Sequence, residues 1–178
     1  MRSAALMLTL LALAGCTTEL RPAGEADQER MLERGYSARD AQIIETGPDG
    51  RARFTLQAAL IEQQPATRDI VLTDIDMRLQ SADAQWHLQA DRGRMPAAAQ
   101  RILLDGDVRL DGQPAGTLAP VSIRTDKLSY DLATSKAVAP GAVFIVLQNH
   151  RLEGTGLEAD LKTYQARIRA DVHGRFTP

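Results

Sequence analysis

The chain has 178 residues, of which 44% are hydrophobic, 4% aromatic and 25% charged, and it contains a single cysteine. A chain of this length buries enough apolar surface to form one domain without a disulfide or a structural metal, and one cysteine excludes a disulfide within the chain. The formal net charge of −2 excludes the basic excess on which binding to nucleic-acid phosphates depends.

The chain begins with a short leader. Arg2 supplies a positive charge, and an uncharged, leucine-rich run follows it. This run of about a dozen residues is too short for a spanning helix, which needs about 20, so residues 1–15 are predicted to be a cleaved export signal. The run ends in Leu13-Ala14-Gly15-Cys16 and resembles the bacterial lipoprotein signal, in which the cysteine thiol carries diacylglycerol. This resemblance implies that Cys16 is lipidated; the alternatives are an ordinary cleaved signal and an apolar N-terminus unrelated to export with an incidental cysteine.

A lipid on Cys16 would tether the protein to a membrane, because each buried methylene contributes about 0.8 kcal/mol. Residues 16–37 are polar and charged and contain Pro22 and Gly24, so they are predicted to be a lipidated linker that gives the domain reach. The residue after the cysteine is Thr17. By resemblance to enterobacterial lipoproteins, an Asp there would favour inner-membrane retention, so Thr17 favours sorting to the outer membrane.

From residue 38 onward, apolar and polar residues alternate in short runs that turn residues interrupt about every 8–12 positions, a pattern typical of antiparallel all-β domains. No segment there has a helical period. Asp49-Gly50, Asp105-Gly106 and Asp111-Gly112 are predicted to form tight hairpin turns, because these residues tolerate positive φ. Five prolines are expected between strands, where a missing N–H costs no ladder bond: Pro65, Pro96, Pro114, Pro120 and Pro140.

A faint internal repeat runs through the alternating region. Each copy has an aliphatic residue, a polar residue, a small or aromatic residue and then Asp, and the aspartates are Asp91, Asp131, Asp160 and Asp171. Since Asp can hydrogen-bond its own backbone, each copy is predicted to end in a turn. The copies are unequally spaced, which argues against a solenoid and favours a β-meander.

Candidate catalytic and metal sites are few. The three histidines lie far apart and none has a second ligand at metal-binding spacing: His87, His150 and His173. Asp74 and Asp76 would share one strand face, as paired catalytic carboxylates do, but an exposed polar face is the simpler interpretation. No serine stands in a nucleophile elbow and Cys16 is committed to the anchor. The chain is therefore predicted not to be an enzyme and to need no metal or cofactor.

Several stretches, in collinear order over about residues 37–176, resemble the periplasmic lipopolysaccharide-export family LptC. They are Trp86–Gly93, Ile102–Leu110, Val121–Leu132, Leu152–Leu161 and Ile168–Gly174. The resemblance implies that residues 38–178 form a twisted antiparallel β-jelly roll with an apolar groove. In the family the groove receives lipopolysaccharide acyl chains from the inner-membrane ABC transporter and passes them to the next jelly roll of a periplasmic bridge. ATP hydrolysis occurs in the transporter. The resemblance also implies a periplasmic location and an anchor in the inner membrane, so that Thr17 leaves the choice of membrane open.

Acyl chains need only apolar burial, which contributes about 25 cal/mol per Å², and edge strands can pair with similar domains. The groove candidates are apolar residues on the inward face of the predicted strands, with Gly156 letting the backbone turn or pack closely beside the last of them: Phe54, Leu56, Met77, Trp86, Leu88, Leu104, Tyr130, Ile145 and Leu157. The same residues could instead form the closed core of a β-sandwich.

The closed-core alternative corresponds to a structural or assembly lipoprotein of the envelope that binds a protein partner through its edge strands. A polysaccharide-binding domain is less favoured, because its stacking residues have no common spacing: Tyr36, Trp86, Tyr130 and Tyr164.

Overall fold

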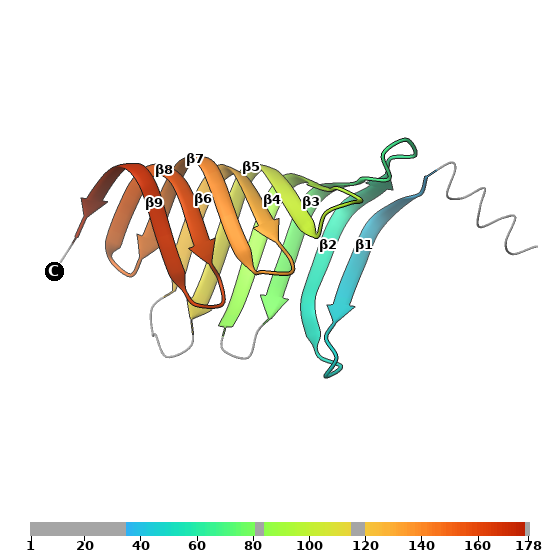
Figure 1. The fold of residues 1–178 in the computed structure, drawn as a ribbon, viewed down its shortest axis with the longest axis horizontal. Coiled ribbons are helices and arrows are strands. Elements are labelled where there is room, and N and C mark those ends of the chain that lie inside the picture. Colours follow the sequence, from blue (N-terminus) through green and yellow to red (C-terminus); the bar gives the residue numbers. More distant parts are fainter. Residues whose placement is uncertain (1–34, 81–83, 115–119, 177–178) are drawn as a thin grey trace, which may run out of the picture.

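The computed structural model describes residues 35–80, 84–114 and 120–176. Cys16, the leader and the linker up to residue 34 lie outside these residues. The described chain forms one sheet of nine antiparallel strands, in which each strand pairs with its neighbours in sequence (Figure 1). The strands are β1 (Ser37–Thr46), β2 (Ala52–Gln63), β3 (Ile70–Gln80), β4 (Ala84–Met95), β5 (Arg101–Pro114), β6 (Val121–Asp131), β7 (Lys136–Leu147), β8 (His150–Asp160) and β9 (Gln165–Arg175).

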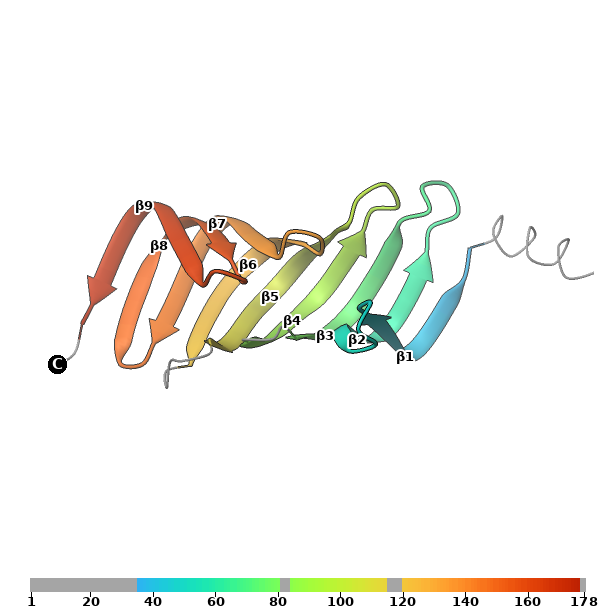
Figure 2. The ribbon, with the colours of Figure 1, turned by 60° about the horizontal axis from the view of Figure 1, so that its bottom comes forward.

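The sheet bends over on itself, so that the two halves of its strands form two layers (Figures 1 and 2). The pairing register shifts in the middle of successive strands, between Asp105 and Val108 in β5 and between Thr125 and Ser129 in β6. A register shift of this kind bends a strand and increases its twist. At the bend, the buried Thr125 hydroxyl donates a hydrogen bond of 2.8 Å to the carbonyl oxygen of Ala142 in the next strand.

Aspartate and glycine occupy the bends, and this corrects part of the turn prediction. Gly106 (φ +85°) and Asp107 (φ +39°) lie inside β5, and Asp171 (φ +52°) lies inside β9. A Cβ on Gly106 would collide with the carboxylate of Asp91 in β4. Prediction of a hairpin at Asp105-Gly106, and of turns after Asp91 and Asp171, was therefore wrong. The left-handed backbone that these residues tolerate serves to bend a strand as well as to reverse it.

Three further predictions fail for related reasons. Asp111-Gly112 lies within β5, Pro114 is the last residue of β5, and Pro140 lies within β7 at its register shift, where no ladder bond is required. The Asp49-Gly50 turn is confirmed. Gly50, at φ +75°, donates its N–H to the carbonyl of Gly47 at 3.0 Å.

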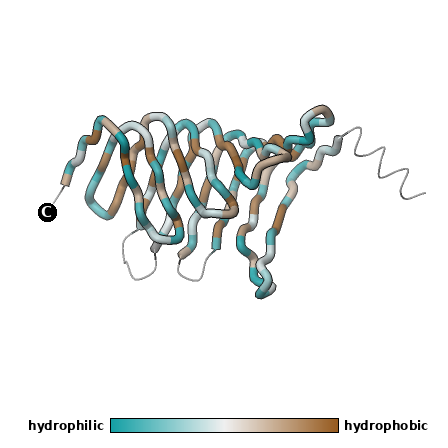
Figure 3. The backbone as a smooth tube through the Cα atoms, in the orientation of Figure 1, coloured by the Kyte–Doolittle hydropathy of each residue, from teal (hydrophilic) through white to brown (hydrophobic). Residues whose placement is uncertain are grey.

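Period-two alternation places the apolar residues between the two layers, and apolar and polar segments alternate along the strands in Figure 3. The buried side chains form one cluster that draws on β2 through β8, and the largest fully buried ones are Leu56, Leu72, Met77, Leu88, Ile102, Val108, Leu110, Val143 and Leu157. The predicted fold class, an all-β antiparallel twisted jelly roll, is confirmed.

Candidate functional site

The nine apolar groove candidates all lie in the buried cluster between the layers. Their exposed fractions run from 0% at Leu88 and Leu157 to 7% at Trp86 and Ile145. Gly156, next to Leu157, has φ +75°, in the region that favours glycine, and a Cβ there would lie 3.3 Å from side-chain carbons of Arg169. The structure brings three of the candidates, Phe54, Trp86 and Tyr130, together at one opening of the interior and distributes the others along it.

This opening, called the mouth below, contains a cavity of about 280 Å³. Both layers contribute apolar walls to it: Phe54, Leu79 and Trp86 from β2, β3 and β4, and Tyr130, Leu132 and Leu161 from β6 and the turns after β6 and β8. Its polar lining consists of Arg53, Gln80, Ser135 and Lys162. The mouth is therefore an apolar recess with two cations in its lining.

Trp86 closes one side of the mouth and depends on a glycine for its position. Trp86 pairs directly with Gly112 in β5, and its indole lies so close over the Gly112 backbone that any Cβ at 112 would collide with the ring. The indole also stacks on Tyr164 from the β8–β9 turn, with ring centroids 6.5 Å apart and an interplanar angle of 26°. Its buried Nε1 donor has no hydrogen-bond partner.

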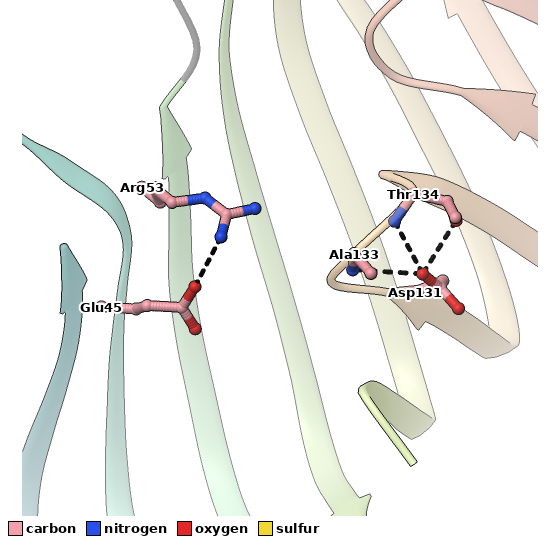
Figure 4. Close-up of polar contacts among 5 residues, drawn as sticks. All are labelled: Glu45, Arg53, Asp131, Ala133 and Thr134. Atoms are coloured by element: carbon pink, nitrogen blue, oxygen red, sulfur yellow. Dashed lines mark hydrogen bonds and ion pairs between the residues drawn. The ribbon is translucent and has the colours of Figure 1, made fainter. Parts of the chain in front are cut away.

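Two turns of the same design form one rim of the mouth. After β6, a carboxylate oxygen of Asp131 accepts hydrogen bonds from the backbone N–H groups of Ala133 (3.1 Å) and Thr134 (2.8 Å), as Figure 4 shows. After β8, Asp160 accepts from the N–H groups of Lys162 (2.9 Å) and Thr163 (3.0 Å) in the same way. The turn prediction is thus confirmed at these two aspartates of the repeat.

Backbone hydrogen bonds tie these turns to each other and to the preceding one. The N–H of Leu161 donates to the carbonyl of Ser135 at 3.0 Å, and the N–H of Leu132 donates to the carbonyl of Gln100 at 2.9 Å. Backbone hydrogen bonds therefore join the three turns in a continuous row.

Polar groups of the mouth are oriented by neighbours. Arg53 forms an ion pair of 2.9 Å with Glu45 on β1 (Figure 4). Burial raises the pKa of the Tyr130 hydroxyl, and its hydrogen bond with Ser135 and the charge of Arg53 offset only part of that rise. Tyr130 therefore stays neutral and presents an uncharged phenol beside the cavity.

A comparison with protein families identifies the chain. A family model described as "Lipopolysaccharide-assembly, LptC-related" matches residues 4–177. The chain belongs to the LptC family. Its role accordingly lies in lipopolysaccharide transport, and the resemblance inferred from the sequence is confirmed. The family's description is one of lipopolysaccharide assembly.

Among solved structures, this LptC-family chain is similar to one titled "Crystal structure of LptH, the LptA homologous periplasmic component of the conserved lipopolysaccharide transport device from Pseudomonas aeruginosa". The TM-score is 0.57 and the identity is 11%, over 70% of this chain and 95% of LptH. This likeness shows a shared fold. No curated protein matches the chain.

Apolar side chains of this LptC-family domain are more exposed toward its last strand. Inward-facing side chains are buried in the middle of the sheet, but Leu147 is 41% exposed, Val172 55% and Phe176 69%. Because β9 pairs only with β8 among the described strands, its other edge has no strand partner within that part of the chain. The apolar interior and a free strand edge therefore coincide at this end.

The outer polar face carries a small hydrogen-bonded group around Asp76. The Nε2 atom of His87 lies 2.7 Å from a carboxylate oxygen of Asp76, and Gln89 donates to the same oxygen at 3.2 Å. Burial alone would raise the pKa of Asp76, but the hydrogen bond and charge of His87 lower it overall. Asp74 sits apart at the bend of β3, with φ +51°. In the part of the chain that is described, no three ligand-type side chains gather around a cation site, and no helix has the length and hydropathy to cross a bilayer.

Proposed function

We propose that this LptC-family protein holds the acyl chains of lipopolysaccharide between its two layers and passes them to the next jelly roll. The observation that carries the proposal is the continuous apolar interior, which runs from the mouth to an exposed apolar end beside a free strand edge. Burial of acyl chains there contributes about 25 cal/mol per Å² and requires no converging polar groups.

The way in which the layers are joined supports entry of a lipid. Each strand makes its ladder hydrogen bonds to its sequence neighbours, so the layers are joined across the interior by side-chain packing. Separating them to admit a chain would break apolar contacts, which the acyl chain replaces, and would leave every strand pair intact. The proposed groove is thus the core region itself, opened by its ligand.

The proposed partners and location follow from the family and the fold. LptH is described as a periplasmic component of a lipopolysaccharide transport device, and we place this protein in the periplasm on that likeness. The free edge of β9 suits pairing with a strand of a similar jelly roll, which would continue the apolar interior into the next domain. Lipopolysaccharide would arrive from the inner-membrane ABC transporter.

Photocrosslinking tests the lipid assignment. A photoreactive residue in place of Leu88, whose side chain is fully buried, is expected to crosslink to lipopolysaccharide. The matched control is the same residue in place of Gln89, the next position on β4, whose side chain faces outward toward Asp76. Crosslinks at both positions or at neither, in a protein that remains folded, would contradict the proposal.

Membrane attachment through Cys16 is a separate part of the proposal and rests on the lipoprotein-type signal. Replacing Cys16 with Ser should move the protein from the membrane fraction to the soluble periplasmic fraction, because the acyl chains would be lost. Equal membrane content of the two proteins would overturn the lipid anchor. Separation of inner from outer membranes before blotting would show which membrane holds it.

The second candidate, an assembly lipoprotein with a closed sandwich, is favoured by the close packing of the core. Leu56 and Met77 are each 1% exposed, so solvent hardly reaches these side chains in the described structure. This candidate predicts that the purified protein captures an envelope protein through β1 or β9 and carries no lipid. A crosslink from position 88 to lipopolysaccharide would exclude it.

A further inference from the structure

The cavity of the mouth has a size that suits a segment of one acyl chain. Its volume of about 280 Å³ lies just below the range of about 300–1,000 Å³ for pockets that take drug-sized ligands, and exceeds the roughly 150 Å³ that suffice for benzene. Aromatic side chains from both layers line it: Phe54, Trp86 and Tyr130. A segment of a single acyl chain fits such a space, whereas a whole glycolipid headgroup does not.

Two cations from opposite sides line the same cavity. Arg53 extends from β2 and is held by Glu45, and Lys162 projects from the β8–β9 turn, where its backbone N–H is fixed by Asp160. No carboxylate among the described residues forms an ion pair with the Lys162 ammonium. Glu45 neutralises part of the charge of Arg53, and the rim also carries the carboxylates of Asp131 and Asp160, which accept backbone N–H groups. Lys162 is therefore the cation of the lining that is available to an anionic group.

A buried donor in the same wall lacks a partner. Trp86 is 7% exposed and its Nε1 has no hydrogen-bond acceptor. An unsatisfied buried donor costs about 1–3 kcal/mol, and native structures contain few of them. The carbonyl oxygen that links an acyl chain to its headgroup is an acceptor of the required kind, located between the apolar chain and the anionic group.

The covering ring is held in an unusual backbone conformation. Tyr164 has φ +57°, which is uncommon for a bulky residue, and such strain tends to persist at ligand clamps. Its ring covers the indole of Trp86 at 6.5 Å. A ligand that displaces the Tyr164 ring would gain access to the indole N–H and replace the stacking contact with its own apolar contact.

We infer that the mouth is a recognition site for one ester- or amide-linked acyl chain of a phosphorylated lipid. The chain lies among Phe54, Trp86 and Tyr130, the linking carbonyl accepts from Trp86 Nε1, and the phosphate lies between Arg53 and Lys162. This inference rests on the proposed function and adds to it a place where the phosphorylated end of the lipid is recognised while the remaining chains enter the interior.

The charge arm of the test uses 1-lauroyl lysophosphatidic acid, which has one ester-linked chain and one phosphate, and follows its binding to the full chain by calorimetry. Arg53→Gln and Lys162→Gln are each expected to weaken binding about three- to fivefold at low salt, and less at high salt. The control, Arg124→Gln, removes an exposed charge from the outer face of β6 and should bind like the wild type. Wild-type affinity in both mouth variants would overturn the inference.

The carbonyl arm compares this ester with the 1-dodecyl ether analogue, which keeps the chain and phosphate but has no carbonyl. The wild type should prefer the ester severalfold, and Trp86→Phe, which keeps a ring but removes the N–H, should bind the two equally. An unchanged ester preference in Trp86→Phe would overturn the carbonyl contact.

The outcomes separate this inference from the proposed function. If position 88 crosslinks to lipopolysaccharide while the Arg53, Lys162 and Trp86 variants bind the probes like the wild type, the mouth site is wrong and the proposed function stands. If the probes bind with the expected dependence while position 88 does not crosslink, the mouth site stands and lipid in the interior is wrong.

Discussion

The two turns that form the rim of the mouth have nearly the same sequence and different roles. Asp-Leu-Ala-Thr-Ser over residues 131–135 and Asp-Leu-Lys-Thr-Tyr over 160–164 use the same carboxylate-to-backbone hydrogen bonds and end in residues of similar φ, +59° at Ser135 and +57° at Tyr164. Ser135 bonds to Tyr130 on the strand before it, whereas Tyr164 reaches across the mouth to Trp86. A repeated backbone device therefore fixes the rim, and one side chain in each copy determines what the rim contacts.

Replacing the leucine of each turn should produce the largest difference in stability between the two turns. Leu161 is 5% exposed, and Leu132 is only partly buried against the core. Leu161→Ala is expected to lower the free energy of unfolding by about 2–4 kcal/mol, because it leaves a cavity in the core, and Leu132→Ala should cost less. Urea unfolding followed by circular dichroism measures both. Equal losses would mean that the two turns pack alike and would remove this part of the comparison.

Replacing Tyr164, the last residue of the second turn, with serine, the last residue of the first, should have a smaller effect on stability. Tyr164→Ser removes the aromatic stack, which contributes about 0.5–1.5 kcal/mol, and exposes Trp86 to water. Emission of Trp86, the only tryptophan, should shift to longer wavelength. Tyr164→Phe keeps the ring and should leave the emission unchanged. If Tyr164→Ser also leaves it unchanged, the ring does not cover the indole in solution.

Asp131 and Asp160, which begin the two turns, should contribute equally to stability at acid pH. This effect is expected to be smaller than those of the leucines and of Tyr164. Backbone N–H groups, of Thr134 for Asp131 and of Thr163 for Asp160, lower the pKa of each carboxyl. A pKa that is lower in the folded state stabilises above the unfolded value of about 3.9, and this stabilisation disappears as the pH falls through the folded pKa.

Asp131→Asn and Asp160→Asn keep an acceptor oxygen but do not titrate, so each should flatten the fall of Tm below about pH 4 to a similar extent. Thermal unfolding between pH 2 and 6 would show this at the same ionic strength for all proteins. A variant that loses Tm as steeply as the wild type would indicate that its aspartate does not contribute to the acid transition.

Features that depend on local sequence, such as the inward face of each strand, could be predicted from the sequence. Contacts that depend on the pairing register of the strands could not. Alternation identified the inward face, from Phe54 to Leu157, and the side-chain chemistry of Asp131 and Asp160 identified their turns. The prediction of a turn at Asp111-Gly112 was wrong, because the backbone conformations that Asp-Gly favours occur at turns and within bent strands alike. Gly112 is required by the indole of Trp86 on the neighbouring strand, a contact that is defined only once β4 and β5 are in register.

The mouth itself was not predicted. Trp86 and Tyr164 are far apart in the chain, and Arg53 and Lys162 belong to unrelated segments that the bending of the sheet brings to one cavity. No local signal in the sequence indicates that these four residues meet, although Tyr164 in place of the small residue that a left-handed turn position usually has would have marked that turn as unusual.

The pairing of every strand with its neighbour in sequence has a consequence for how the molecule forms. Every main-chain ladder in the described sheet joins consecutive strands, so none of these ladders has to wait for a distant segment. Chains with such short-range pairings lose less loop entropy before their contacts form and fold faster than β proteins with long-range pairings. Hairpins of this protein can therefore assemble in order from the amino-terminal end, each providing a template for the next strand as the chain becomes available.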